Sequence, residues 1–438
     1  MHMSENNNVV VVGLGYIGLP TAVVLANHGS RVVGVDINQA NVERINRGEI
    51  PFVEPGLEEQ LAHVVAEGTL SATTETPHGE AYIVAVPTPF KDNYEGDLSY
   101  IRAASANIAP QLHGDELIIL ESTSPPQTTR KMAEHILELR PDLSLDGADG
   151  KPAIHVAHCP ERVLPGKVME ELITNDRIIG GMTREATRRA KALYATFCVG
   201  ELLETDDVTA EMAKLTENSF RDVNIAFANE LSLIADKLGI DVWELIELAN
   251  HHPRVNILQP GPGVGGHCIA VDPWFIVSSA PEESRLIRTA REVNDAKPEW
   301  VISKVKEAAE GIAAPVVAAL GLAFKPDIDD LRESPALEIT KRLAEEFPHG
   351  TILAVEPHVA KLPPALEGRK NVRFAEPQDA IKHADVVVLL VDHQQFRLLP
   401  KGILDGKQIV DTKGLWRPGK SSALTVNTTS IPIVAAAR

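Results

Sequence analysis

The 438-residue sequence has few cysteines, with only Cys159, Cys198 and Cys268. This small, odd number excludes a disulfide framework and favours a reducing compartment. No apolar run is long enough to span a bilayer without a glycine or proline interrupting it. The first residues also lack the basic and then apolar pattern of a secretory signal. We therefore expect a cytoplasmic protein without membrane association.

The sequence also has fewer basic than acidic residues. The sequence has 42 basic against 61 acidic residues, a net charge of −19. This balance excludes general binding to nucleic acid or to anionic lipid. An anionic substrate would therefore be held by a few locally placed cations and backbone N–H groups. The length exceeds that of one typical core, so two or three domains are expected.

Short apolar, β-branched runs alternate with helix-like stretches at both ends of the sequence. The runs are residues 8–13, 31–36, 81–86, 116–120 and 153–156, and then 316–320, 351–355, 372–374, 385–391 and 408–411. Such alternation predicts parallel sheets with helical crossovers. Between the two series, residues 206–238 form a long helical stretch without proline. The predicted fold is α/β, with two doubly wound Rossmann-like domains joined by a long central helix.

A glycine-rich loop follows the first predicted strand. Residues 13–18 read Gly-Leu-Gly-Tyr-Ile-Gly, and Asp36 ends the next strand. In this context Gly13 allows a tight turn, Gly15 lets a pyrophosphate approach the backbone, and Gly18 permits close packing of helix and strand. Asp36 would accept hydrogen bonds from the adenosine ribose and repel a 2′-phosphate, which favours NAD over NADP. The alternative is a glycine-rich turn that binds nothing.

The second informative loop, residues 260–273, is dense in glycine and proline and contains Cys268. Gly265 and Gly266 would let a substrate lie against the backbone, and Asp272 follows four residues after the cysteine. A structural cysteine normally lies inside an apolar element, so this pattern favours a reactive thiol over an incidental one. A metal site formed with His251, His252 and His267 is disfavoured, because the spacing does not suit zinc and CxxC is absent.

Polar residues recur along one face of the long helix at three- and four-residue spacing. They are Glu211, Lys214, Asn218 and Arg221. The stripe is either solvated, which is the usual meaning, or faces a substrate, where a lysine stabilises developing negative charge. Glu161 follows a strand end in the loop 158–166 and is either a general base or an exposed carboxylate. Hydroxyls in the strand-end loop 120–126 would face a cofactor.

Taken together, these motifs resemble the UDP-sugar 6-dehydrogenases of the UDP-glucose/GDP-mannose dehydrogenase family over nearly the whole chain. The matching segments are residues 11–18 with Asp36, 54–57, 86–89, 121–123, 160–161, 211–218, 265–268, 324–326 and 331–334. The resemblance implies an NAD-binding Rossmann domain at 1–203, a central helical dimerisation domain at 204–300 and a UDP-sugar-binding Rossmann-like domain at 301–438.

The resemblance also implies a role for each matching residue. Cys268 is the nucleophile, Lys214 and Asn218 hold and polarise the reacting oxygen, and Asp272 supports the lysine and the oxyanion water. Glu161 is the base for thioester hydrolysis, and Thr123 positions water. The implied cofactor contacts are Gly13, Gly15, Tyr16, Ile17, Gly18, Asp36, Pro87, Thr88, Thr123 and Arg332. The implied substrate contacts are Arg162, Val163, Leu164, Lys214, Asn218, Arg254, Asn256, Gly265, Phe324 and Lys325. Arg254 would come from the other subunit of a homodimer, and no metal is expected.

Two segments indicate the sugar. Residues 160–166 and 266–275 resemble UDP-N-acetylhexosamine dehydrogenases, and the second segment is most similar to the enzyme that acts on UDP-N-acetyl-D-mannosamine in surface polysaccharide synthesis. The expected reaction oxidises the C6 alcohol to the carboxylate with two NAD+ through a Cys268 thiohemiacetal and thioester. The alternatives are UDP-N-acetylglucosamine or UDP-glucose as substrate, a silent NAD- and UDP-sugar-binding protein, and a two-electron hydroxy-acid dehydrogenase.

Overall fold

The computed structural model describes residues 8–91, 94–266, 268–400 and 402–417, so His267 and residues 1–7 lie outside the described residues. The chain divides into two compact units. The first contains residues up to 227 together with 266–294, and the second contains 228–265 together with residues from 295 onward. The predicted three-domain boundaries stay a prediction. Within the described ranges, no helix has the length and apolar character needed to cross a membrane.

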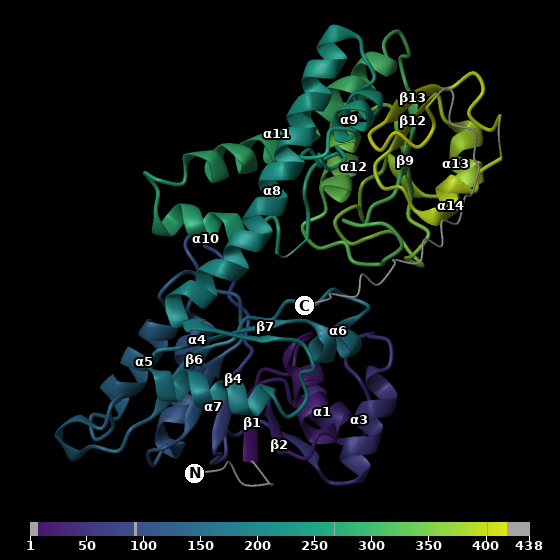
Figure 1. The fold of residues 1–438 in the computed structure, drawn as a ribbon. Helices are drawn as coiled ribbons and strands as arrows, with labels where there is room; N and C mark the ends of the chain where they lie inside the picture. The colour runs from purple at the N-terminus through teal and green to yellow at the C-terminus, as the bar shows by residue number, and fades with distance from the viewer. Residues whose placement is uncertain (1–7, 92–93, 267, 401, 418–438) are drawn as a thin grey trace, which may run out of the picture. The chain divides into compact units, whose positions relative to one another are not determined.

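An eight-stranded sheet forms the centre of the first unit (Figure 1). Its strands are β1 (Asn8–Val12), β2 (Arg31–Val35), β3 (Leu70–Thr73), β4 (Ala81–Val84), β5 (Leu117–Leu120), β6 (His155–His158), β7 (Arg177–Gly181) and β8 (Leu202–Asp206). They lie in the order β3-β2-β1-β4-β5-β6-β7-β8. Every pair is parallel except β6 with β7. The five apolar runs predicted from the sequence correspond to β1, β2, β4, β5 and β6, which pair in parallel as expected. Strands β3, β7 and β8 are not among the predicted runs, and β7 makes the sheet mixed.

Helices cover both faces of this sheet. They are α1 (Gly18–Asn27), α2 (Gln39–Asn46), α3 (Leu57–Ala66), α4 (Ser99–Ile108), α5 (Thr128–Leu139), α6 (Val168–Thr174) and α7 (Arg184–Tyr194). Successive strand residues point to opposite faces, so Val9 and Val11 pack with α1, α3, α6 and α7. Val10 packs with α4 and α5 on the other face. This double covering explains why β1 is apolar at consecutive positions, and it confirms the predicted doubly wound domain.

The long helix α8 (Asp207–Leu238) agrees with the predicted stretch 206–238. Its first part packs in the first unit against α10 (Asp272–Ser279) through Leu215, Phe275 and Ile276. A buried ion pair joins it to α11 (Arg285–Ala308), where Arg291 lies 2.6 Å from Asp222. Removing one partner of such a pair typically costs about 3–5 kcal/mol, so this contact holds α8 and α11 together.

Helix α11 continues through Pro298. A proline inside a helix removes one hydrogen bond and normally ends it. Here Val301, Ile302 and Val305 are buried in the core of the second unit. Their burial offsets the hydrogen bond that the proline removes.

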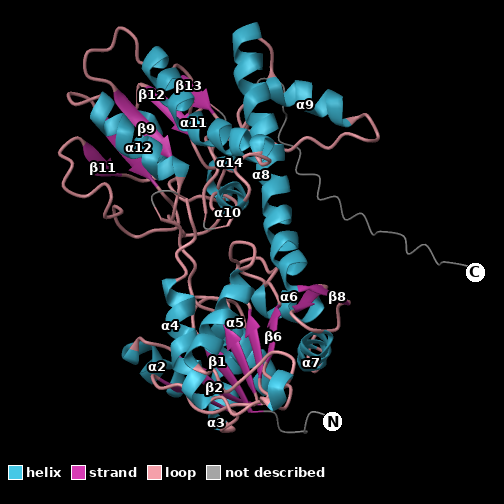
Figure 2. Cartoon of the chain, turned by 90° about the vertical axis from the view of Figure 1, so that its left-hand side faces the viewer, coloured by secondary structure: helices cyan, strands magenta, loops and turns pink. Residues whose placement is uncertain are grey.

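A smaller parallel sheet forms the centre of the second unit, in the order β11-β10-β9-β12-β13. Its strands are β9 (Val316–Leu320), β10 (Thr351–Val355), β11 (Val372–Phe374), β12 (Val386–Leu389) and β13 (Gln408–Asp411). The C-terminal part of α11 and α12 (Pro335–Glu346) pack on one side of it, and α13 (Pro377–His383) and α14 (Gln394–Arg397) pack on the other. Helix α9 (Val242–Asn250) packs instead against α8 through Val242 and Ile246. Figure 2 shows β9, β12 and β13 as neighbouring strands. The second predicted Rossmann-like domain is confirmed.

The two units repeat one local structure that no sequence repeat reveals. Gly13 and Gly321 both follow a central strand and have positive φ angles of 95° and 89°. In each unit the next residue donates its N–H to a carboxylate at the end of the adjacent strand. Leu14 N lies 2.9 Å from Asp36 Oδ2, and Leu322 N lies 2.7 Å from Glu356 Oε2. The same strand-end turn is therefore built from different residues.

Candidate active site

The three glycines of the loop between β1 and α1 have different surroundings. A Cβ on Gly13 would lie 2.4 Å from the Ala85 carbonyl oxygen, and a Cβ on Gly18 would lie 1.8 Å from the Gly13 oxygen. Both positions therefore need glycine for the protein's own packing. A Cβ on Gly15 would meet no atom within 4 Å. Open space at the start of a helix fits a pyrophosphate, which backbone N–H groups and the helix dipole favour there.

Other predicted cofactor residues lie at the carboxyl ends of neighbouring strands. Asp36 directly follows β2 and accepts hydrogen bonds from Leu14 N at 2.9 Å and Asn38 N at 2.8 Å. The Thr88 hydroxyl donates to the Thr123 carbonyl oxygen, which joins the loops after β4 and β5. The strand order reverses between β1 and β4, and ligands of open α/β sheets bind in the crevice at such a point.

The open space at Gly15 gives a testable prediction. Gly15→Ala should leave the melting temperature close to that of wild type, because the new methyl group touches no protein atom. The methyl group should instead meet the cofactor and raise the Kd for NADH by about tenfold or more, equivalent to about 1.4 kcal/mol. Fluorescence titration with NADH measures the Kd. Unchanged NADH binding by a folded Gly15→Ala variant would contradict this placement of the pyrophosphate.

Two residues of the predicted stripe on α8 converge with α10. Asn218 donates a 2.6 Å hydrogen bond to Asp272, whose side chain is only 3% exposed. Burial raises the pKa of Asp272 to about 6, while the Asn218 hydrogen bond and the positive charge of Lys214 oppose that rise. Lys214 and Asn218 are one helical turn apart on α8. The predicted grouping of Lys214, Asn218 and Asp272 is thus present in the first unit.

Glu161 is a second buried carboxyl group whose pKa is affected by the charge of Lys214. Its side chain is 8% exposed, and burial raises its pKa to about 7 against the opposing charges of Lys214 and Arg177. Its Oε1 atom has no hydrogen-bond partner among the described residues. A carboxyl group that titrates near neutrality with an oxygen available suits a general base. The alternative of a solvated surface carboxylate does not fit this burial.

Cys268 differs from the other cysteines in its exposure. It is exposed, whereas Cys159 and Cys198 are buried. Burial raises the pKa of the Cys159 thiol well above its usual range, which makes that thiol a poor nucleophile. The Cys268 carbonyl oxygen accepts hydrogen bonds from Val271 N at 3.1 Å and from Asp272 N at 2.8 Å. A turn therefore leads directly from the cysteine into α10 and the buried Asp272.

The remaining stripe residues have other surroundings. Glu211 is buried and accepts hydrogen bonds from Thr129 N at 2.7 Å and from the Thr129 hydroxyl at 2.6 Å, so it ties α8 to α5. Arg221 is exposed. Glu121 is also structural, because it forms a buried ion pair with Arg177 at 3.0 Å. The spacing of the stripe correctly places residues on one face but does not separate anchoring residues from candidate catalytic ones.

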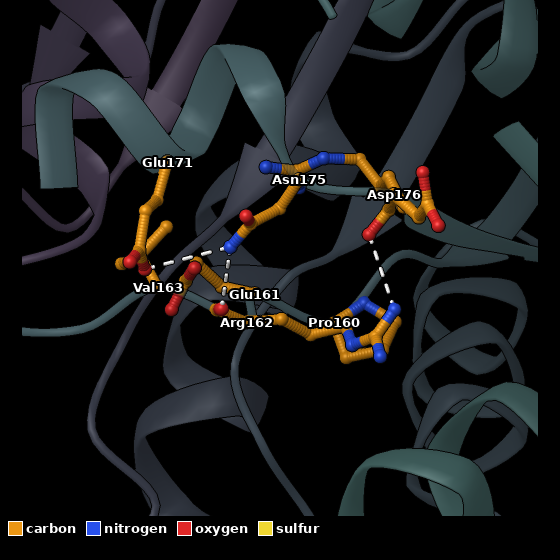
Figure 3. Close-up of a pocket in the computed structure, with 8 residues that line it drawn as sticks. Pro160, Glu161, Arg162, Val163, Glu171, Asn175 and Asp176 are labelled. Atoms are coloured by element: carbon orange, nitrogen blue, oxygen red, sulfur yellow. Dashed lines mark hydrogen bonds between the residues drawn. The ribbon is translucent and has the colours of Figure 1, made fainter. Parts of the chain in front are cut away.

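Arg162, Val163 and Leu164 lie on the loop after β6, which residues outside the sequence prediction hold in place. Leu164 N donates to Glu171 at 2.7 Å, and Asn175 donates to the Arg162 carbonyl oxygen at 3.1 Å. The Arg162 guanidinium donates to the Asp176 carbonyl oxygen and pairs with Glu217 at 2.7 Å. Figure 3 shows the pocket at this loop, lined by Pro160, Glu161, Arg162, Val163, Glu171, Asn175, Asp176 and Arg177.

Six predicted residues lie in the second unit. They are Arg254, Asn256, Gly265, Phe324, Lys325 and Arg332. A Cβ on Gly265 would lie 2.4 Å from the Glu333 oxygen and 3.0 Å from Phe324 Cβ, so this glycine packs directly against the predicted Phe324 loop. Arg254 and Lys325 are exposed, and Arg332 pairs with Asp330 at 2.6 Å. The cationic side chains of Arg254 and Lys325 are thus accessible for an anionic ligand.

Known proteins match the chain along nearly its whole length. Models of the UDP-glucose/GDP-mannose dehydrogenase family match as the NAD binding domain at residues 7–198, the central domain at 208–296 and the UDP binding domain at 318–418. An NDP-N-acetyl-D-galactosaminuronic acid dehydrogenase from Ralstonia nicotianae is 56% identical over 95% of this chain and 97% of that protein. A UDP-N-acetyl-D-mannosamine dehydrogenase from Escherichia coli is 55% identical, covering 93% and 99%. The structure of a UDP-N-acetyl-mannosamine dehydrogenase from S. aureus aligns with a TM-score of 0.82 at 43% identity, covering 94% and 96%.

Proposed function

Because the chain belongs to the UDP-glucose/GDP-mannose dehydrogenase family, with that family's NAD binding domain at residues 7–198, we propose that it oxidises the C6 alcohol of a UDP-N-acetylhexosamine to the carboxylate. UDP-N-acetyl-D-mannosamine is the first candidate substrate. The observation that carries the proposal is the grouping of the buried Glu161 and Asp272 carboxyl groups around Lys214, together with the exposed Cys268 that leads into α10.

The chain's own residues perform the covalent chemistry. NAD+, held by the loop 13–18 and Asp36, supplies the hydride acceptor, and two equivalents are needed because converting an alcohol to an acid removes four electrons. After the first oxidation, the Cys268 thiolate adds to the aldehyde carbon to form a thiohemiacetal. The second oxidation gives a thioester. Covalent capture retains the aldehyde and splits a difficult conversion into easier steps.

Lys214, Asn218 and Glu161 act on the oxygen atoms of the reaction. The Lys214 ammonium and the Asn218 amide donate to the reacting oxygen and stabilise its negative charge. Asp272 orients Asn218 through their 2.6 Å hydrogen bond. Glu161 takes a proton from a water molecule that Thr123 positions, and the resulting hydroxide attacks the thioester carbon. The C–S bond breaks, and the acid and the Cys268 thiolate are released.

The remaining predicted residues bind the substrate and assemble the site. We assign the UDP-sugar to Arg162, Val163, Leu164, Asn256, Gly265, Phe324 and Lys325, and a further cofactor contact to Arg332. Arg254 completes the site of the other subunit in a homodimer. Apolar side chains exposed on and after α8 and on α9 support this assembly; they include Phe227, Ile234, Leu238, Ile240 and Leu248. A monomeric mass by light scattering would contradict it.

The identity of the sugar rests on the relatives and on two segments of the sequence. The names of relatives at 55–56% identity divide between an N-acetylgalactosaminuronic acid and an N-acetylmannosamine. Both sugars carry the N-acetyl group, which supports this part of the proposal. The galacto-configured sugar is the second candidate because the Ralstonia relative matches equally well. A role in surface polysaccharide synthesis follows from the mannosamine assignment and stays part of the proposal.

The decisive experiment counts the NADH formed per sugar consumed. The purified protein is incubated with NAD+ and, separately, with UDP-N-acetylmannosamine, UDP-N-acetylgalactosamine, UDP-N-acetylglucosamine or UDP-glucose. We expect two NADH per sugar, and the highest kcat/KM with UDP-N-acetylmannosamine. One NADH per sugar would contradict the four-electron reaction. Failure to oxidise any of the four sugars while binding NADH would identify a silent binding protein instead.

A further inference from the structure

A single buried carboxylate joins the candidate cofactor loop to the candidate substrate loop. Glu54 precedes α3, and its side chain is only 3% exposed. The Tyr16 hydroxyl donates to its Oε2 atom. Gly166 N donates to the same oxygen at 3.0 Å, and Val168 N donates to Oε1 at 2.8 Å. Glu54 thus accepts hydrogen bonds from segments that lie 38 and 112–114 residues away in the sequence.

The two segments have different tasks in the proposed reaction. Tyr16 belongs to the glycine-rich loop at the start of α1, where the cofactor pyrophosphate would lie. Gly166 lies near the end of the loop that carries Glu161 and the predicted sugar contacts Arg162 to Leu164, and Val168 begins the helix α6 that follows it. Gly166 N also lies 3.3 Å from the Tyr16 hydroxyl. The ends of the two loops therefore meet at one carboxylate.

The hydrogen bonds of Glu54 connect the two loops directly, so a change in one loop reaches the other. Hydrogen bonds to a charged acceptor are shorter and stronger than neutral ones, and a buried group that loses its partners pays the full desolvation penalty. A cofactor that fixes the glycine-rich loop also fixes the Tyr16 hydroxyl. Glu54 then holds Gly166 and Val168 in the arrangement that the sugar needs, so less ordering remains to oppose sugar binding.

We infer that Glu54 is a positioning residue that couples NAD binding to UDP-sugar binding through the Tyr16 hydroxyl. The inference rests on the proposed function. By linkage, the cofactor must tighten sugar binding by the same factor by which the sugar tightens cofactor binding. We call this the coupling factor, and we infer that the Glu54 carboxylate controls it. If Glu54 had only a structural role, replacing it would change the stability of the protein or the affinities for both ligands but would leave the coupling factor unchanged.

The test measures this factor with NADH and UDP-N-acetylmannosamine, which bind together without turnover. NADH fluorescence gives its Kd with and without saturating sugar. For wild type we expect the sugar to tighten NADH binding by about fivefold or more. Tyr16→Phe keeps the aromatic ring beside Phe52, whose centroid is 5.1 Å away, and removes only the hydroxyl. In this variant, and in Glu54→Gln, the factor should fall close to one.

Glu171→Gln is the matched control. Glu171 holds the same substrate loop through Leu164 N at 2.7 Å, but its described hydrogen bonds do not reach the glycine-rich loop. This variant should weaken sugar binding and keep the wild-type factor. If Tyr16→Phe and Glu54→Gln both kept the coupling factor of wild type, with melting temperatures near that of wild type, the inference about Glu54 would be wrong while the proposed function would stand. Failure of the wild-type protein to bind either ligand would overturn the proposed function, and the inference with it.

Discussion

Cys268→Ser should lower the rate of acid formation by about a thousandfold or more. A serine hydroxyl is far less nucleophilic than a thiolate at neutral pH and forms no thioester. The NADH yield should therefore fall from two per sugar to at most one. Absorbance at the NADH band together with mass spectrometry of the sugar product measures both quantities. The first oxidation needs no covalent bond to the protein, so any residual product should be the aldehyde.

Cys198→Ser provides the control for this variant. Cys198 lies in the same unit, is buried, and donates a weak hydrogen bond to the Asn175 carbonyl oxygen at 3.4 Å. A serine hydroxyl preserves a donor at this position, so the activity should stay close to that of wild type. If Cys268→Ser formed the acid as fast as Cys198→Ser, Cys268 would not be the nucleophile.

Glu161→Gln should slow hydrolysis of the thioester by about 10²- to 10⁴-fold, the usual contribution of a general base. The steps before hydrolysis do not use this carboxylate. A covalent adduct on Cys268 should therefore accumulate and appear in the intact mass of the protein after mixing with UDP-sugar and NAD+. Glu58→Gln, an exposed position on α3, is the control and should show no adduct. Acid formation at the wild-type rate without an adduct would remove Glu161 from the mechanism.

The same carboxyl group sets a pH dependence. Because the Glu161 pKa is raised to about 7, the hydrolysis rate of the wild-type protein should fall as the pH falls through 7 and the base becomes protonated. The raised pKa has the opposite effect on stability. Folding favours the protonated form of Glu161. The contribution of this carboxyl group to the stability of the folded protein is therefore complete below pH 4.5, the ordinary pKa of a glutamate, and is lost as the pH rises through 7.

At pH 8 the buried charge of Glu161 should therefore be unfavourable by about 3 kcal/mol, the equivalent of a shift from 4.5 to about 7. Glu161→Gln should melt at a higher temperature than wild type at pH 8 and lose this advantage at pH 4. Thermal denaturation at the two pH values measures the difference. A lower melting temperature for the variant at pH 8 would contradict the buried position of the charge.

The sequence predicts those parts of the site that depend on local spacing. Gly13 and Gly18 are recognisable because the turn and the close packing need glycine within six consecutive residues. Lys214 and Asn218 are recognisable because four residues make one helical turn. The alternation of apolar runs likewise predicts the smaller sheet and five of the parallel strands of the larger one, though not its antiparallel pair of β6 with β7. The turn, the helical repeat and the apolar alternation each depend on residues that are close together in the sequence, so each can be recognised from the sequence alone.

Contacts between distant segments are not predictable in this way. Glu171 and Asn175 are ordinary polar residues in the sequence, and only the packing of α6 beside the loop after β6 shows what they hold. Glu54 and Glu217 lie in segments that match the family, yet the sequence does not show that they bind the loop after β6. Glu211 shares the spacing of Lys214, yet its partner Thr129 is 82 residues away. Helical periodicity reports which face a residue lies on, and the neighbouring element decides whether that residue anchors the helix or meets a ligand.

The hydrogen bond between Asp36 and Leu14 limits how the coenzyme preference can be redesigned. Accepting NADP requires removing the negative charge at position 36, because a carboxylate repels the 2′-phosphate. Removing the side chain altogether would also take the acceptor from Leu14 N and loosen the loop that both coenzymes need. Asparagine at this position removes the charge and keeps one oxygen to accept from Leu14 N. Its amide nitrogen replaces the oxygen that accepts from Asn38 N, so that second hydrogen bond is lost. The useful starting point for a change of coenzyme is therefore Asp36→Asn, with new cations added around it.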